Sequence, residues 1–355
     1  MKKYIIRSTL ILILGFITLK IRAESLFTNY FLEYQTEVQY NFKDKFNWVN
    51  LWTLGTDVNI YKNGYLSIGT LSVYKTSDDR IADDLQTFSN IEEDNMPLSF
   101  YILGYTHKFR NAQLFFGIRN INLDYFIGDY TSFFTNSSCG IHPTLAENYT
   151  VANYPESAMA LHLDIRFTEN LLLKNSLYNG RARQLSDNGI SFFKIAPRRD
   201  GFMNLTELSY QTNNYSYGLY SIGIGLCNRY FSYYDDGQEI NKKINYTLWG
   251  NIEKELFSFG NSTLGILMEG SFAGKKNSYC KSFIGGGVFM NINGKTNIGA
   301  FIDHAVFSHA NETAMEFTCS YPLTDFLEIK PTLHHIITGS KNYTIGLIRF
   351  ILNIN

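Results

Sequence analysis

Apolar and polar residues alternate at every second position along many short segments of this chain. In 312–321 one series reads Thr313, Met315, Phe317, Cys319 and Tyr321, and the other reads Glu312, Ala314, Glu316, Thr318 and Ser320. The period recurs in 114–119, 159–167, 219–226, 264–272, 327–334 and 348–355. A period of two places alternate side chains on opposite faces of a β-strand. The chain therefore predicts many strands, each with one apolar and one polar face.

Short turn signals separate these runs, as in "KNGY" at 62–65, "TEN" at 168–170 and "PLTD" at 322–325. Longer polar segments, 75–96 and 126–155, interrupt the series. Tyr and Phe favour strands, and aromatic residues make up 16% of the chain. The sequence predicts an all-β protein with short turns at one end of its strands and long loops at the other.

The first residues have the composition of an export signal. A basic start, "MKK", precedes an apolar core at 8–19, and Ala23 ends a plausible cleavage site. The core is shorter than the ~20 residues that a membrane-spanning helix needs, although an uncleaved anchor is the alternative. We expect residues 1–23 to be a secretory signal peptide and 24–355 to form a single domain.

Composition argues against several functional classes. The formal net charge is −1, which gives no electrostatic reason to expect nucleic acid as a partner. The four cysteines at 139, 227, 280 and 319 are scattered, with no CxxC or Cys/His cluster of the kind that binds zinc. The sequence predicts no metal site and no cofactor.

Alternation alone suits a soluble β-sandwich as well as a membrane barrel. Export, the succession of hairpins, and aromatic residues near strand ends, such as Tyr101, Tyr105 and Phe109, favour a barrel with interfacial girdles. In lipid a sheet has to close on itself so that every backbone group is paired. Sixteen strands would leave about 21 residues per strand and connection. We predict a closed antiparallel up-and-down transmembrane β-barrel of 16 strands; 18 fit nearly as well.

Several segments resemble the carbohydrate-selective porins of the OprB type. The similarity lies in "DDLQTFSNIEE" at 83–93, "DYTSFFTNSSCGIHPT" at 129–144, "YPESAMALHLDIRFTENLLLKNSLYNG" at 154–180 and "GFMNLTELSYQ" at 201–211. It continues in the C-terminal hairpin at 311–337, Pro331 included. Each motif alone is weak, but their order covers nearly all of the expected mature chain.

This resemblance implies a 16-stranded barrel in the bacterial outer membrane, reached after export to the periplasm, that passes sugars by diffusion, with monosaccharides favoured. Its implied partners are small sugars, outer-membrane lipid and lipopolysaccharide, and the outer-membrane assembly machinery. Such barrels usually end on an aromatic residue that this machinery reads, whereas this chain ends "FILNIN", where Ile354 could take that role. A homo-oligomer is left open.

Strand phase nominates residues that line the bore. Those opposite the apolar series are Arg119, His162, Asp164, Arg166, Lys174, Glu316, Glu328, Lys330 and Arg349. A basic residue facing lipid near the midplane would cost ~2–4 kcal/mol, so these side chains are expected to point inward. They would either contact the solute or form an ordinary bore lining.

The long segment 124–155 is expected to fold inward as a constriction, with an ordinary extracellular loop as the alternative. Its candidate polar residues are Asp124, Asp129, Asn136 and Ser137, and its candidate stacking platforms for sugar rings are Tyr130, Phe133 and Phe134. A basic group follows at Arg181, Arg183, Arg198 and Arg199. It would form a rung of the bore or a solvated loop that meets lipopolysaccharide phosphates.

Two other functions share this fold. An outer-membrane lipid hydrolase needs a nucleophile beside a histidine, and no GxSxG motif accompanies the seven histidines. A non-conducting binding or adhesion barrel would look the same in sequence. Pro331 lies within a predicted strand and removes a ladder donor, so a bulge or a strand end is expected there.

Overall fold

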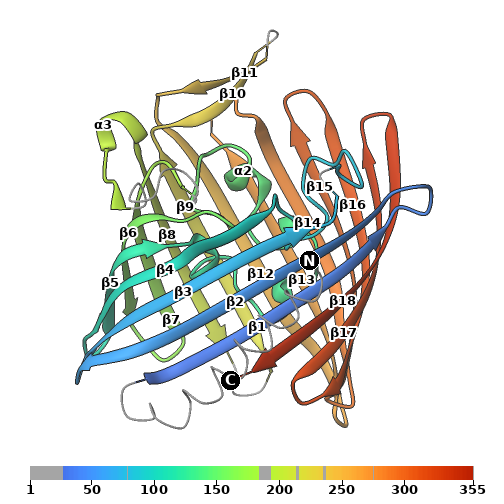
Figure 1. The fold of residues 1–355 in the computed structure, drawn as a ribbon, viewed down its shortest axis with the longest axis horizontal. Helices are drawn as coiled ribbons and strands as arrows, with labels where there is room; N and C mark the ends of the chain where they lie inside the picture. Colours follow the sequence, from blue (N-terminus) through green and yellow to red (C-terminus); the bar gives the residue numbers. More distant parts are fainter. Residues whose placement is uncertain are drawn as a thin grey trace.

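The computed structural model describes residues 27–77, 79–183, 193–212, 216–234, 237–274 and 276–354. Sixteen strands form one closed barrel, in the order β1-β18-β17-β16-β15-β14-β13-β12-β9-β8-β7-β6-β5-β4-β3-β2 (Figure 1). Every neighbouring pair is antiparallel, and β1 closes the barrel by pairing with β18 from Leu32↔Ile354 to Tyr40↔Gly346. The predicted 16-stranded up-and-down barrel is confirmed. The expected signal segment, 1–23, lies outside the described residues.

The barrel strands vary in length around the circumference. They are β1 Phe27–Tyr40, β2 Phe46–Tyr61, β3 Gly64–Lys75, β4 Met96–Lys108, β5 Ala112–Arg119, β6 Ala158–Arg166, β7 Leu171–Asn179, β8 Phe202–Thr212, β9 Gly218–Cys227, β12 Asn245–Phe259, β13 Ser262–Ala273, β14 Cys280–Ile292, β15 Thr296–Phe307, β16 Asn311–Thr324, β17 Leu327–Thr338 and β18 Lys341–Ile354. A separate hairpin pairs β10 Tyr230–Tyr234 with β11 Gly237–Asn241. In the described part of the chain, no helix is long and apolar enough to cross a bilayer.

The two ends of the barrel differ in their connections. The links after β2, β4, β6, β8, β12, β14 and β16 have two to five residues each, and all lie at one end, which we call the short-turn end. The links 76–95, 120–157, 180–201 and 228–244 lie at the opposite, long-loop end. The β10–β11 hairpin and α3 (Pro197–Asp200) belong to these long links and stand at the upper rim in Figure 1. This asymmetry is typical of outer-membrane barrels.

Side chains alternate between an apolar outer face and a polar inner face. On β16, Phe317 is 54% exposed on the outside, whereas the neighbouring Glu316 is 3% exposed inside the barrel. Large exposed apolar residues recur on the outer face, for example Phe116, Ile222 and Leu333. The outside is therefore suited to hydrocarbon, and the charged residues of the strands point inward.

Two of the long links enter the barrel and fill part of it. The first, 76–95, packs Ile81, Ala82 and Phe88 against Ile336, Ile345 and Leu347 of the wall. The second, 120–157, contains η1 (Ile121–Leu123), η2 (Thr131–Phe133), η3 (Ser137–Cys139) and α2 (Pro143–Ala146). Figure 1 shows α2 inside the ring of strands. We call these links the first and second inward segments.

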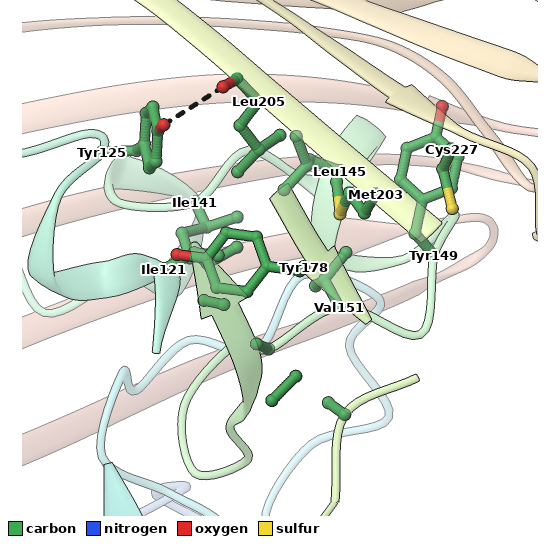
Figure 2. Close-up of a cluster of buried hydrophobic side chains, with 14 of the residues drawn as sticks. Ile121, Tyr125, Ile141, Leu145, Tyr149, Val151, Tyr178, Met203, Leu205 and Cys227 are labelled. Atoms are coloured by element: carbon green, nitrogen blue, oxygen red, sulfur yellow. Dashed lines mark hydrogen bonds between the residues drawn. The ribbon is translucent and has the colours of Figure 1, made fainter. Parts of the chain in front are cut away.

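The second inward segment turns sharply because its polar residues cap short helices. Asn120 and Asn136 accept hydrogen bonds from the backbone N–H groups of Asn122 and Ser138, two residues on. Pro143 opens α2, where its missing N–H costs nothing. In Figure 2, apolar residues of this segment pack against Tyr178, Met203 and Leu205 of β7 and β8, and Tyr125 donates to the carbonyl of Leu205 at 3.2 Å.

Pro331 lies well within β17, and the expected bulge there is wrong. Pairing between β17 and β16 runs from Thr318↔Thr332 to Tyr321↔Ile329 without a register shift, but lapses at the two positions between. Pairing with β18 continues through Pro331↔Ile348. β17 therefore loses its pairing only on the β16 side, because proline has no N–H to donate. The register of the strand is unchanged.

Candidate pore constriction

Two cavities lie inside the barrel, one on each side of the second inward segment. The outer chamber, about 450 Å³, is lined by residues of both inward segments, among them Glu92, Glu147 and Tyr154. The inner chamber, about 400 Å³, is lined by strand residues closer to the short-turn end, such as Gln113, Asp164 and Gln211. Phe126, Ile127 and Thr131 line both chambers. We call these three residues the constriction.

Glu253 of β12 fixes the constriction to the barrel wall. Its carboxylate accepts the backbone N–H of Tyr130 at 3.1 Å and of Thr131 at 2.7 Å, together with the Thr131 hydroxyl at 2.6 Å. The Tyr217 hydroxyl also donates to it, at 2.5 Å. These N–H groups start η2, which has no side-chain cap of its own, so a carboxylate on the wall supplies the missing acceptor.

Glu316 of β16 holds the same segment further along the chain. It accepts the backbone N–H of Thr135 at 2.8 Å and of Asn136 at 2.9 Å. The Thr135 hydroxyl lies 2.9 Å from Nε2 of His334. The Asn136 side chain donates to Asp303 of β15 at 2.6 Å. The second inward segment is thus bonded to two separate parts of the wall, β12 and β15–β17.

The first inward segment is attached in the same way. Glu312 of β16 accepts the backbone N–H of Leu85 at 2.6 Å and of Gln86 at 2.9 Å. The two inward segments also meet, since the N–H of Asn90 donates to the carbonyl of Thr135 at 2.8 Å. Three wall carboxylates, Glu253, Glu312 and Glu316, therefore each accept two successive backbone N–H groups.

The predicted site residues Arg119, Asp124, His162, Asp164 and Lys174 come together beside the inner chamber. Arg119 donates to both oxygens of Asp124, at 2.6 and 2.5 Å. Lys174 donates to the Asp124 carbonyl and, at 3.2 Å, to Glu207. Nε2 of His162 lies 3.0 Å from Asp164 and 3.4 Å from Asp124. Because Asp124 lies in the second inward segment and the others belong to β5–β7, this cluster joins that segment to the barrel wall.

The outer chamber also carries both signs of charge. Lys330 donates to the carbonyl of Phe133 at 3.1 Å, and Arg349 pairs with Glu37 at 2.6 Å. Facing them, burial raises the pKa of Glu92 to about 7, helped by the charges of Asp84 and Glu37. Burial likewise raises the pKa of Glu147 to about 7, with Arg80 acting in the opposite direction. Two of the acids at this chamber therefore titrate near neutral pH.

The remaining predicted site residues are distributed differently. Asn136, Glu316 and Lys330 form part of the wall attachments described above. Asp129 is exposed and lines the inner chamber. Glu328 is partly exposed, accepts from Ser320 at 2.6 Å, and lies 3.7 Å from Lys330.

Three predicted residues lie away from both chambers. Arg166 is exposed at the short-turn end and donates to the carbonyl of Glu169 in its own turn, because β6 ends there. Arg181 is exposed in the 180–201 link at the rim. Arg183 is buried in an ion pair with Asp200, which also pairs with Arg199. These two pairings, with the hydrogen bond from Asn179, hold the pKa of Asp200 well below its ordinary value, although burial opposes them.

The aromatic residues proposed as stacking platforms do not face a chamber as open ring surfaces. Tyr130, Phe133 and Phe134 are at most 6% exposed and pack against Phe289 and Phe301 of the wall. That prediction is wrong, because their rings bury apolar area beneath the segment instead. The apolar side chains at the constriction are Phe126 and Ile127, of which Ile127 is 49% exposed.

The sequence interpretation missed the first inward segment and three wall residues that bond the two inward segments. Glu253, Asp303 and Glu312 lie on the polar face of their strands, so alternation could have nominated them. The buried residues Ile81, Phe88 and Ile91 within a polar link were a second signal. The sequence alone could not predict the hydrogen bonds between these wall residues and link residues more than 100 positions away in the chain.

One arrangement resembles a hydrolase triad. Ser176 Oγ lies 2.6 Å from Nδ1 of His162, whose Nε2 faces Asp164. Ser176 and His162 are fully buried, and the Tyr125 hydroxyl lies 2.8 Å from Ser176 Oγ. The Ser176 hydroxyl is thus covered by the second inward segment, inside the barrel and away from lipid.

Among the described residues, no group of three or more His, Cys, Asp or Glu side chains has a metal-binding arrangement.

A closed 16-stranded barrel with a long loop folded into its bore defines the porin class of outer-membrane fold. No family model matches the sequence, and no curated protein matches it. Among solved structures, the high-pH structure of Pseudomonas putida OprB superimposes with a TM-score of 0.80 at 13% identity, over 95% of this chain and 96% of that one. The OprB-like fold inferred from the sequence is confirmed.

Other porin-fold structures are more distant. A loop L8 deletion mutant of OmpT, an outer membrane protein of Vibrio cholerae, gives a TM-score of 0.60 at 11% identity, over 93% of this chain and all of that one. An anion-selective porin from Comamonas acidovorans gives 0.59 at 9% identity, over 92% and 99%. At these identities the likeness concerns the fold.

Proposed function

We propose that this protein is an outer-membrane porin through which small polar solutes, sugars among them, diffuse passively. The observation that carries the proposal is the pair of polar chambers that share Phe126, Ile127 and Thr131 in their linings inside a closed barrel. An apolar outer face and a polar interior are what a channel wall in a bilayer requires. No catalytic group is needed for this function.

Sugars suit the chemistry of both chambers. Their hydroxyls donate to carboxylates and accept from guanidinium and ammonium groups, and both kinds of group face each chamber. The side chains of Phe126 and Ile127, which line both chambers, offer apolar contact to a ring face. The fold likeness to OprB supports a carbohydrate preference, with monosaccharides favoured because two inward segments occupy the bore.

The outer surface fits the expected surroundings. The apolar band would contact outer-membrane lipid after export and insertion by the assembly machinery. The exposed Arg181 and Arg198 at the long-loop end would meet lipopolysaccharide phosphates. Arg183 is less suited to this role, since Asp200 already binds its guanidinium.

Liposome swelling beside planar-bilayer recording tests the proposal. Folded protein can be recognised by a gel mobility that changes when the sample is heated in denaturant. This folded, purified protein should form discrete channels. It should also admit monosaccharides faster than di- and trisaccharides. Folded protein that forms no channels would instead favour a non-conducting binding or adhesion barrel. Turnover of phospholipid by the same preparation would favour a lipid hydrolase.

A further inference from the structure

The charges that line the inner chamber do not balance. Two cationic side chains, Arg119 and Lys174, face five carboxylates, Asp124, Asp129, Asp164, Glu207 and Glu253. With all of them ionised, the described lining of this chamber carries three negative charges in excess. A narrow bore lined by one sign of charge between low-dielectric walls concentrates counter-ions.

Both cations are already engaged by carboxylates. Arg119 makes two hydrogen bonds to Asp124, and its side chain is 11% exposed. Lys174 lies 3.2 Å from Glu207. These two pairs nearly cancel, so neither cation offers an unopposed charge to a passing anion. The excess therefore resides on Asp129, Asp164 and Glu253.

None of these three acids has a cationic lysine or arginine among its described hydrogen-bond partners. Glu253 is bonded by backbone N–H groups and hydroxyls, which leave its charge in place. Asp164 faces His162, which is charged only when protonated, and accepts from Gln113 at 3.2 Å. Asp129 is exposed to the chamber, and Glu253 is the nearby charged group that acts on it.

A second feature of the chamber also favours a donor-bearing solute. Asn251 of β12 lines the chamber and is 95% buried, since its exposed fraction is 5%. Its Oδ1 has no hydrogen-bond partner among the described residues. An unsatisfied amide oxygen beside three carboxylates that bind no lysine or arginine favours an N–H donor over an acceptor in this chamber.

We propose that the inner chamber makes the bore cation-selective and favours small solutes that carry a protonated primary amine, such as amino sugars, over anionic solutes of the same size. This inference rests on the proposed porin function and adds its charge preference. The outer chamber adds to this preference but contributes less, because its described lining has three carboxylates, Glu92, Glu93 and Glu147, against Lys330 and Arg349. Neutral sugars remain permeant, since they meet no charge barrier.

The reversal potential of single channels in a potassium chloride gradient tests the inference. A reversal potential with the sign expected for potassium permeation supports the inference. A reversal potential of the same sign in a gradient of glucosamine hydrochloride supports it as well. Channels that conduct with chloride preference, or with none, overturn the charge inference and leave the porin function standing. Absence of any channels from folded protein overturns both.

A charge-neutralising variant locates the effect. Asp129→Asn should lower the potassium-to-chloride permeability ratio about two- to fivefold, as expected for one unit charge removed a few ångströms from the ion path. Asp325 lies in the exposed β16–β17 turn, at the short-turn end of the barrel near the inner chamber. Asp325→Asn removes an equal charge outside the bore and should leave the ratio unchanged. Equal effects of the two variants would overturn the assignment to the inner chamber. Because Asp129 is exposed and its side chain supports no described hydrogen bond, this variant should fold.

Discussion

Glu316 on β16 accepts the backbone N–H of Asn136 at 2.9 Å, although the two residues are 180 positions apart in the chain. The same carboxylate accepts the N–H of Thr135. Buried carboxylates that bind successive backbone donors replace the hydration that those donors lose inside the barrel. The shape of the bore therefore depends on a few wall side chains as much as on the inward segments themselves.

Replacing Glu316 by Gln should loosen the second inward segment. An amide has one acceptor oxygen and cannot match a carboxylate that binds two N–H groups, so we expect a loss of about 1–3 kcal/mol in the free energy of unfolding. Single-channel records should show larger conductance with more flicker. Glu328→Gln is the matched control, because Glu328 faces the same interior but binds no backbone N–H of the segment. Identical records for the two variants would contradict this view of Glu316.

The buried Arg119–Asp124 pair should contribute to stability through compensation of charge. Asp124→Asn leaves the Arg119 guanidinium buried without its carboxylate, and breaking such a pair typically costs about 3–5 kcal/mol, less where water reaches it. The temperature at which the folded gel band disappears should fall. The double variant Arg119→Met with Asp124→Asn should recover part of this loss. A double variant that loses more free energy of unfolding than the two single variants lose together would contradict this explanation.

Ion selectivity should depend on pH through the outer chamber. Glu92 and Glu147, each with a pKa of about 7, are largely neutral at pH 6 and largely ionised at pH 8. Cation preference should therefore rise with pH across this interval. The variant Glu92→Gln with Glu147→Gln should flatten the change, and an unaltered pH profile would rule out these two residues as its source.

The outer face can be tested with one pair of aromatic residues. Phe317 lies in the middle of β16 and is 54% exposed, whereas Phe326 lies in the adjoining short turn and is 55% exposed. Phe317→Arg should destabilise folding into lipid vesicles by about 2–4 kcal/mol, and Phe326→Arg by about 0–1 kcal/mol. Denaturant titrations of both proteins in vesicles provide the measurement. Equal costs would mean that Phe317 does not face hydrocarbon.

The barrel could be predicted from sequence because its signal is local. Alternation within each strand assigns Phe317 to one face and Glu316 to the other, and the short turns set the hairpins. Polar phase alone also nominated Arg119, His162, Asp164 and Lys174, which the structure brings into one cluster. Pro331 shows the limit of local rules, since one missing N–H changed the ladder without the expected bulge.

The bore was harder to predict because its contacts are long-range. Residues 76–95 have the composition of an ordinary polar link, yet their N–H groups bind Glu312, more than 200 positions away. Tyr130, Phe133 and Phe134 suggested exposed platforms, but their burial depends on Phe289 and Phe301 of distant strands. The spacing of residues within one segment does not predict which wall residues that segment will contact.

Thiol modification at the constriction tests most directly whether solute passes between the two chambers. Ile127 is half exposed and lines both chambers, whereas Cys139, Cys227 and Cys280 are buried and Cys319 lies on the outward face of β16. Single channels of Ile127→Cys should lose most of their conductance when a bulky methanethiosulfonate reacts, and wild-type channels should not. Complete modification of Cys at position 127, verified by mass, with undiminished conductance would contradict the account.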